Sequence, residues 1–205
     1  MRNPTTLFGL AVLAAASISC GDVVRDGRSP VFLSLETLQA SSGGGSTTLG
    51  NVLFSDVQRI VVSGGTCTPA TPCPTTFSDP GLATFRVVPK DVVGLPTATT
   101  NNEVLITRYH VSFRRSDGRN VQGVDVPYAF DGAATGIVAA GNGGSLTFEL
   151  VRHVSKEESP LVQLITSRTV LTTLADVTFY GKDRVGNDVT ATGTIQVDFG
   201  NFGDI

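Results

Sequence analysis

The fold is decided by residues 174–199, which read LADVTFYGKDRVGNDVTATGTIQVDF. Apolar side chains occupy alternate positions in two runs within this segment: Ala175, Val177 and Phe179, then Val189, Ala191, Ile195, Val197 and Phe199. Alternation with β-branched and aromatic residues is typical of half-buried strands. Between the runs, Gly186 and Asn187 tolerate the positive φ angles of a tight turn. The segment therefore predicts a long β-hairpin with strands over 174–181 and 189–199, and it places Asp198 on the face toward water.

Similar patterns occur upstream of this hairpin. Expected strands cover 31–38, 82–88, 104–113 and 145–152, and a further apolar stretch covers 51–63. In the strand over 104–113, alternation predicts one shared face for Leu105, Thr107, Tyr109, Val111 and Phe113. The only helical signal lies in 155–167. There Ser155 begins a capping-box sequence, but Pro160 limits the segment to a short helical turn.

Composition agrees with a chain built from strands. Charged residues are only 16% of the 205 residues, glycine is abundant at 23, and valine and threonine recur throughout, which favours strands over helices. We therefore expect an all-β fold of about seven to nine antiparallel strands with long loops, chiefly over 41–50 and 64–81. Because many short strands separated by turn signals are typical of sandwiches and barrels, one layered domain over 30–205 is predicted.

Two stretches resemble known β-sandwich families. The segment ITRYHVSF, residues 106–113, resembles the third strand of a fibronectin type III domain, and VTFYGKDRVGN, residues 177–187, resembles the last hairpin of bacterial immunoglobulin-like modules. The resemblance implies an immunoglobulin-like β-sandwich and carries no activity. The chain departs from the pattern in having no tryptophan and in exceeding the ~100 residues of such domains.

The N-terminus predicts export. Arg2 precedes an apolar run over 7–18, and small residues lead to Ser19-Cys20. That order predicts a secretory signal over 1–19, and the run is shorter than the roughly 20 residues that a membrane span needs. It resembles the lipobox of bacterial lipoproteins, although Ser17 stands where the family usually has a larger aliphatic residue. The resemblance implies that Cys20 is lipidated and that 20–29 tethers the domain to a membrane of the cell envelope, facing the periplasm or the surface. The alternative is cleavage after the alanines at 14–16, which would leave Cys20 a plain thiol.

The two other cysteines form a separate feature. Cys67 and Cys73 enclose a short loop rich in proline and threonine. Because exported proteins meet oxidising conditions, we predict a disulfide between them, which contributes about 2 kcal/mol by loop closure. A metal site would require further ligands nearby, and the sequence offers none close to this loop.

Charge and motifs narrow the function. The net charge is −3, and removing Arg2 with the signal leaves 14 basic against 18 acidic residues, or −4, which argues against nucleic-acid binding. No catalytic motif is present, and His110 and His153 are the only histidines, so a hydrolase is the remotest candidate. A calcium- or glycan-binding envelope domain is the alternative. Calcium is favoured by the aspartates in predicted turns, although no calcium-loop motif is present; these aspartates are Asp117, Asp125, Asp131, Asp183 and Asp188. The scarcity of aromatic residues counts against glycan binding.

One basic cluster suggests a partner. Arg114, Arg115 and Arg119 lie close together in the sequence, near Arg108, and such a patch can bind an acidic envelope protein. The alternative is a solvated face on which these charges pair with neighbours such as Asp117. We expect a non-enzymatic, lipid-anchored envelope protein that acts as a binding or structural module, without a cofactor or a metal.

Overall fold

The computed structural model describes residues 28–90 and 100–202. The predicted signal segment, Cys20 and most of the predicted tether lie outside these residues. Within the described ranges, no helix combines the length and the hydropathy that crossing a bilayer requires.

The described residues contain ten strands and three short helical segments, so the expected seven to nine strands were too few. The strands are β1 Val31–Ala40, β2 Val52–Asp56, β3 Arg59–Val61, β4 Cys73–Thr75, β5 Asp79–Pro89, β6 Val104–Arg114, β7 Phe130–Val138, β8 Gly144–Val151, β9 Leu171–Asp183 and β10 Asp188–Gly200. The helical segments are η1 Thr100–Asn102, α3 His153–Glu157 and η2 Leu161–Ile165. The expected all-β class is confirmed.

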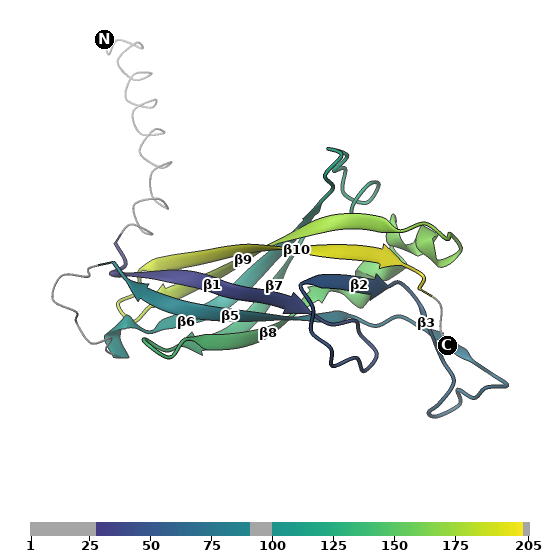
Figure 1. Ribbon diagram of the computed structural model, residues 1–205, viewed down its shortest axis with the longest axis horizontal. Helices are drawn as coiled ribbons and strands as arrows, with labels where there is room; N and C mark the ends of the chain where they lie inside the picture. The colour runs from purple at the N-terminus through teal and green to yellow at the C-terminus, as the bar shows by residue number, and fades with distance from the viewer. Residues whose placement is uncertain (1–27, 91–99, 203–205) are drawn as a thin grey trace, which may run out of the picture.

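The strands form three sheets (Figure 1). One sheet has the order β1-β5-β8, the second has the order β2-β10-β9-β6-β7, and β3 pairs with β4 in a small third sheet. Every pairing between these strands is antiparallel except one: β2 runs parallel to β10, with Val52 beside Gln196 and Asp56 beside Gly200. The expectation that all strands would be antiparallel was therefore wrong at this edge. Alternation of apolar and polar residues shows which side chains share a face of a strand. It does not show whether the neighbouring strand runs parallel or antiparallel.

The two larger sheets share one hydrophobic core. Phe179 on β9 meets Phe85 on β5 with ring centroids 4.9 Å apart, and it meets Phe148 on β8 at 5.1 Å, both edge to face. Tyr109 on β6 completes this cluster, 5.1 Å from Phe148. Because each contact joins a strand of one sheet to a strand of the other, aromatic packing holds the two layers together.

The decisive hairpin forms as predicted. Strands β9 and β10 pair along their whole length, and the alternating apolar side chains quoted above are all buried. The turn places Gly186 at a φ of +92°. One detail differs, because Asp198 is only 8% exposed. The side-chain amide of Gln196 donates hydrogen bonds to both carboxylate oxygens of Asp198, at 3.2 and 3.0 Å. These bonds give the Asp198 carboxylate a hydrogen-bonding partner although it is shielded from water.

Strand β6 departs from simple alternation. Ile106 is fully buried and Leu105 is 39% exposed, whereas the pattern placed Leu105 on the buried face. The pairing of β6 with both of its neighbours shifts register between Ile106 and Arg108, which is the signature of a β-bulge at Thr107. The extra residue reverses the faces, so that Tyr109, Val111 and Phe113 are buried as predicted.

The segment predicted as a helical turn contains two short helical pieces, α3 and η2. Helix α3 begins at His153, and Arg152 at its N-cap makes no side-chain capping hydrogen bond, so the predicted cap at Ser155 was wrong. Lys156 of this helix is almost completely buried, at 1% exposure.

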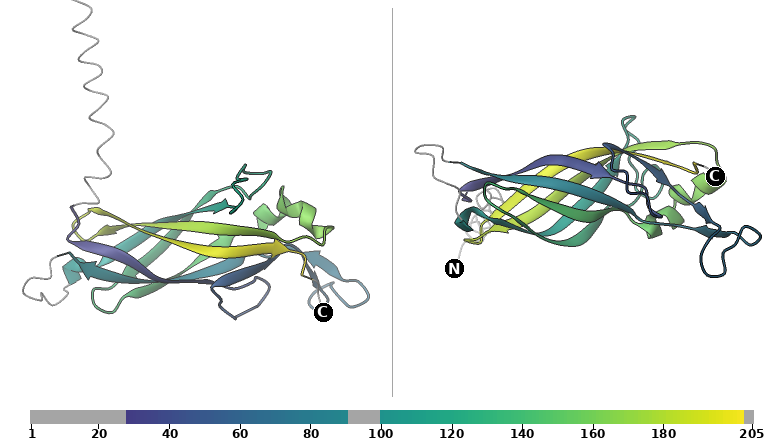
Figure 2. Two further views of the ribbon diagram at one scale, coloured as in Figure 1. Left: turned by 45° about the horizontal axis from the view of Figure 1, so that its top comes forward. Right: turned by 60° about the horizontal axis from the view of Figure 1, so that its bottom comes forward.

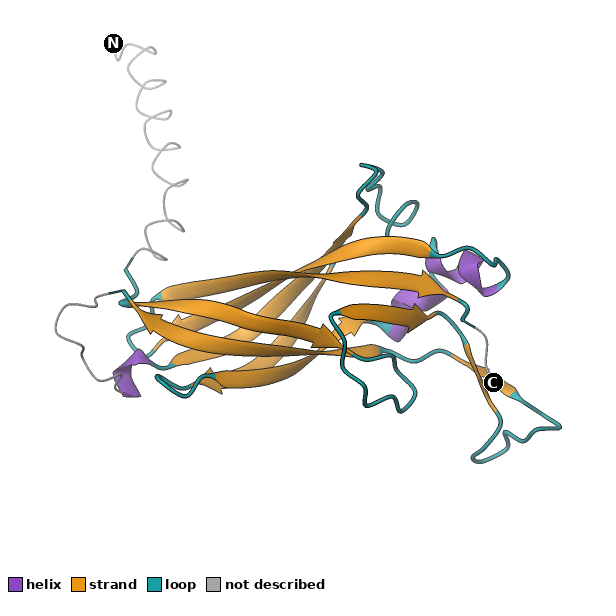
Figure 3. Ribbon diagram, viewed as in Figure 1, coloured by secondary structure: helices purple, strands orange, loops and turns teal. Residues whose placement is uncertain are grey.

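The domain is elongated, with two unlike ends (Figure 2). At one end, called the proximal end, the described chain begins and η1 and the β9–β10 turn over 184–187 lie together. The other end, called the distal end, carries the β3–β4 hairpin, α3 and η2, and the loop over 115–129 projects from the side of the sheet in this half of the domain, as the colouring by secondary structure shows (Figure 3). Strands therefore form the body, and the longest connections gather at the distal end.

Candidate interaction surface at the distal end

The loop over 115–129 joins β6 to β7 and holds two of the three predicted partner-binding arginines. Gly118 begins its return at a φ of +81°, a backbone conformation that favours glycine. A second turn at Gly123, with a φ of +76°, brings the chain against the ring of Tyr128, which leaves no room for a side chain there. The loop is therefore shaped by its own turns and is also anchored by Val126, which is fully buried in the core.

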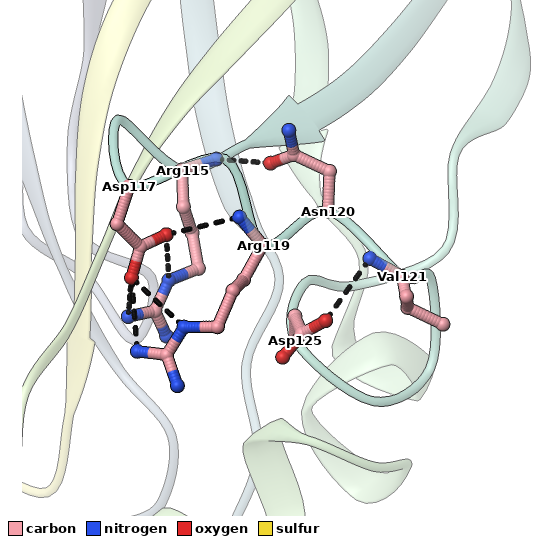
Figure 4. Close-up of polar contacts among 6 residues, drawn as sticks. All are labelled: Arg115, Asp117, Arg119, Asn120, Val121 and Asp125. Carbon is pink, nitrogen blue, oxygen red and sulfur yellow. Dashed lines mark hydrogen bonds and ion pairs between the residues drawn. The ribbon is translucent and has the colours of Figure 1, made fainter.

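Asp117 binds both arginines of this loop (Figure 4). Arg115 donates from Nε and Nη2 to the two carboxylate oxygens at 3.0 and 2.6 Å. Arg119 donates from Nε and Nη2 to Oδ2 at 3.0 and 2.9 Å. The hydrogen bonds from Arg115 and then Arg119 hold the pKa of Asp117 well below its usual range. The cluster thus stays ionised at neutral pH and carries a net charge of +1, from two cations and one anion.

Two more polar side chains support the loop (Figure 4). Asn120 accepts a hydrogen bond from the Arg115 amide at 2.6 Å, and Asp125 accepts one from the Val121 amide at 3.2 Å. Because these acceptors bond backbone amides, they fix the path of the chain. The arginine side chains are thereby held on an ordered backbone, with Arg119 itself 65% exposed.

The third predicted arginine lies elsewhere. Arg114 is the last residue of β6, and its side chain lies on the outer face of the sheet, where it donates to Asp176 on β9 at 2.6 Å. That hydrogen bond raises the pKa of Arg114 above its usual value. Asp176 also accepts a hydrogen bond from Thr194 at 2.6 Å. The structure therefore separates Arg114 from the pair that meets at Asp117.

Three apolar side chains of the same loop are exposed, and the sequence interpretation passed over them. Val121, Val124 and Tyr128 are 60%, 66% and 53% exposed. Aromatic and arginine side chains are enriched where proteins bind each other. The sequence did contain a signal for this exposure, because these large apolar residues lie in a segment without the alternation of a strand.

A groove forms a second feature of the distal end. It encloses about 690 Å³ between the β1–β2 loop, β2 and β3, and Phe54, Phe77, Phe202 and Arg59 contribute to its lining. Phe54 is 60% exposed, and its ring meets that of Phe202 edge to face at 5.9 Å. Arg59 reaches across to donate a hydrogen bond to the Gly44 carbonyl at 2.8 Å. The groove is therefore lined by aromatic side chains and by the glycine-rich backbone of the β1–β2 loop.

The predicted disulfide is present in the β3–β4 hairpin. Cys67 and Cys73 are bonded to each other, and Thr68 and Thr71 exchange backbone hydrogen bonds at 3.0 Å within the enclosed loop. The hairpin is thus closed both by sulfur and by backbone pairing, at the far tip of the domain (Figure 1).

His110 and the turn aspartates have ordinary protein partners, and His153, the first residue of α3, is exposed. His110 Nδ1 lies 3.2 Å from Asp131 Oδ1 on the open outer face of the sheet, where their side chains are 34% and 65% exposed. Asp183 accepts hydrogen bonds from the amides of Val185 and Asn187 at 3.0 and 2.8 Å. Among the described residues, no three His, Cys, Asp or Glu side chains group as metal ligands would.

Comparison with protein-family models gives no match to this sequence, and comparison with curated protein sequences gives none either. The chemistry of the distal end is therefore the basis for assigning a role.

Proposed function

We propose that the protein is a non-enzymatic, lipid-anchored protein of the bacterial cell envelope, and that its immunoglobulin-like domain binds a protein partner through the distal end. The anchor is the expected lipid on Cys20. The observation that carries the proposal is a separation in space: the described chain starts at one end, and the exposed loop over 115–129 projects from the side of the sheet in the other half of the domain. A tether at the proximal end would leave the distal loops facing away from the membrane.

The strand order supports the immunoglobulin-like interpretation. In such domains strands A, B and E lie in one sheet, and C, F and G lie in the other, with C′ added beside C in some members. Assigning β1, β5 and β8 to A, B and E reproduces the first sheet. Assigning β6, β7, β9 and β10 to C, C′, F and G reproduces the order of the second. Strand β2 then adds an edge beside G, and the excess length falls in connections, mainly those over 41–51, 57–78 and 152–170.

The composition of the loop over 115–129 supports a protein partner. It combines exposed Val121, Val124 and Tyr128 with the cations of Arg115 and Arg119. Rigid scaffolds that display loops at one end are a common basis for recognition. We therefore expect the partner to offer an apolar surface bordered by acidic groups.

Photo-crosslinking in the native envelope tests this proposal. A photoreactive amino acid replaces Val124 at the distal end or, as the matched control, Val185 in the proximal turn, where the native valine is 76% exposed. We expect one discrete adduct from position 124 and none from position 185. Adducts from 185 alone, or from neither site, would overturn the role of the distal end. Cys20→Ser, which should release the protein from the membrane fraction, tests the anchor separately.

A further inference from the structure

A buried amine and a buried carboxyl group meet below the distal loops. Lys156 of α3 places its Nζ 3.0 Å from Oδ1 and 2.9 Å from Oδ2 of Asp79, the first residue of β5. The two side chains are 1% and 0% exposed. The sequence analysis placed Asp79 in an expected loop and Lys156 in an expected helical turn without assigning either a role, and the interaction surface described above does not use them.

Buried apolar residues lie near the pair in the sheet and along the chain. Val151 lies opposite Asp79 in the pairing of β5 with β8, and Leu53 and Val57 lie on either side of Ser55 in the chain. All three apolar side chains are at most 1% exposed. Burying a charged amine and a charged carboxylate in such a place carries a desolvation cost, and an uncharged amide formed from the two groups would not carry it. Exclusion of water also protects an amide from hydrolysis and favours its formation from an amine and an acid.

Two donors converge on the carboxyl oxygens of Asp79. The Gly43 amide donates to Oδ1 at 2.8 Å, and the Ser55 hydroxyl donates to Oδ2 at 2.6 Å. Donors fixed at a carboxyl group stabilise the negative charge that develops on oxygen when a nucleophile adds to the carbon. Lys156 is held in place by a third contact, a hydrogen bond from Nζ to the Asp56 carbonyl at 2.9 Å.

We propose that Lys156 and Asp79 condense into an intramolecular amide, a covalent cross-link between α3 and β5. One ammonium proton moves from Nζ to an Asp79 oxygen, which gives a neutral amine and a carboxylic acid. The amine lone pair then forms a bond to Cγ, and the Cγ–OH bond breaks. The leaving oxygen takes a second Nζ proton through the Ser55 hydroxyl and departs as water. No oxidant, cofactor or second substrate is needed.

Geometry and burial both favour this step. Holding two reacting groups within contact distance replaces a bimolecular encounter, and intramolecular effective molarities reach roughly 10⁵ M or more. Desolvation is the largest influence on Asp79, and it raises the pKa of this carboxyl group despite the opposing effects of Lys156 and Ser55. The protonated acid that the condensation requires is thus favoured relative to an exposed aspartate.

The cross-link would differ from the disulfide in position and chemistry. It joins residues 77 positions apart, beneath the segments that carry Gly43 and Ser55, whereas the cysteines are only six apart. An amide survives reducing agents. The base of the distal end would therefore stay closed under conditions that open the β3–β4 hairpin.

Peptide mapping of the full-length protein purified from the producing cells tests the proposal. We expect a branched peptide in which the segments holding Asp79 and Lys156 are joined, with a mass lower than their sum by one water molecule and with no tryptic cleavage after Lys156. Two linear peptides of unchanged mass, from protein that circular dichroism shows to be folded, would overturn it. Lys156→Arg is the matched control, because it keeps the cation and removes the condensing amine.

A time course on newly synthesised protein tests the assigned role of Ser55. Ser55→Ala removes the hydroxyl that donates to Oδ2, and we expect the branched peptide to form at least tenfold more slowly. Its appearance at the wild-type rate would show that the Ser55 hydroxyl carries no proton in this step. Wild-type protein followed in parallel gives the reference rate.

Discussion

The ring of Tyr109 lies against the backbone of Gly132, its direct neighbour on β7, so closely that any side chain at position 132 would overlap it. The same tyrosine reaches the opposite sheet, where its hydroxyl accepts a hydrogen bond from the Glu149 amide at 3.2 Å. Gly132 therefore provides the space that lets one aromatic side chain connect both layers of the core.

Gly132→Ala is expected to destabilise the domain by about 3 kcal/mol, the upper range for forcing extra volume into a packed core. The added methyl group must displace the Tyr109 ring, which is only 4% exposed and held by its neighbours. Urea unfolding followed by circular dichroism measures the change. Gly136→Ala in the same strand is the control, because its nearest contact is a flexible Leu146 methyl at 3.1 Å. Equal effects from both variants would contradict the explanation.

A double variant isolates the contact. If Tyr109 is the cause, Gly132→Ala combined with Tyr109→Leu should cost less than the sum of the two single changes, because the smaller side chain leaves room for the methyl group. Simple additivity of the free energies of unfolding would show that Gly132 acts through the backbone instead.

Local pattern was enough to predict the regular parts of this fold. The hairpin β9–β10, the strand over 82–88 and the disulfide follow from residue spacing alone, because alternation, turn residues and cysteine separation are all local. The features that could not be predicted from the sequence depend on how each strand pairs with the strands beside it. The bulge at Thr107 reverses the faces of β6 without any break in the chain's alternation, and the parallel pairing of β2 depends on where β10 lies.

The candidate site shows the same division. Arg115 and Arg119 were found because charges cluster in the sequence, and their pairing with Asp117 joins residues two positions apart. The exposure of Tyr128 depends on a loop path set by two glycine turns. Lys156 was missed entirely, because a lysine is expected at the surface and only the partner at position 79 explains its burial.

The acid in the proximal turn predicts a pH dependence. Burial opposes ionisation of Asp183, but hydrogen bonds from Asn187, Ser29 and Val185 outweigh it and lower the pKa below 3.8. The folded protein then binds fewer protons here than the unfolded chain, so this contribution to stability is present above about pH 4 and is lost as pH falls through the folded pKa.

Asp183→Asn tests this directly. The wild type should be more stable than the variant at pH 7, by about 1 kcal/mol, because the charged acceptor bonds the turn amides more strongly. The difference between the two proteins should shrink as the pH is lowered from 4 to about 2. A difference that stays constant over this range in paired thermal scans would exclude the assigned titration.

Opening the disulfide should have a moderate effect. Replacing Cys67 and Cys73 by serine removes the loop constraint from the unfolded chain, and we expect the free energy of unfolding to fall by about 2 kcal/mol. The β3–β4 pair forms a sheet of its own, so limited proteolysis should cut the variant first within residues 62–72. Unchanged stability together with unchanged cleavage would show that backbone pairing alone closes this hairpin.

The last prediction concerns the two cations of the distal loop. Arg115→Ala combined with Arg119→Ala should leave the thermal midpoint unchanged, because both side chains pair with Asp117 at the surface and such pairs contribute little to stability. The same variant should reduce the adduct formed from position 124, and the loss should be larger at low salt, where electrostatic attraction to an acidic partner is strongest. Arg114→Ala is the matched control, since its side chain binds Asp176 on the sheet face. Equal loss of the adduct in both variants would place the partner's acidic groups over the sheet rather than the loop.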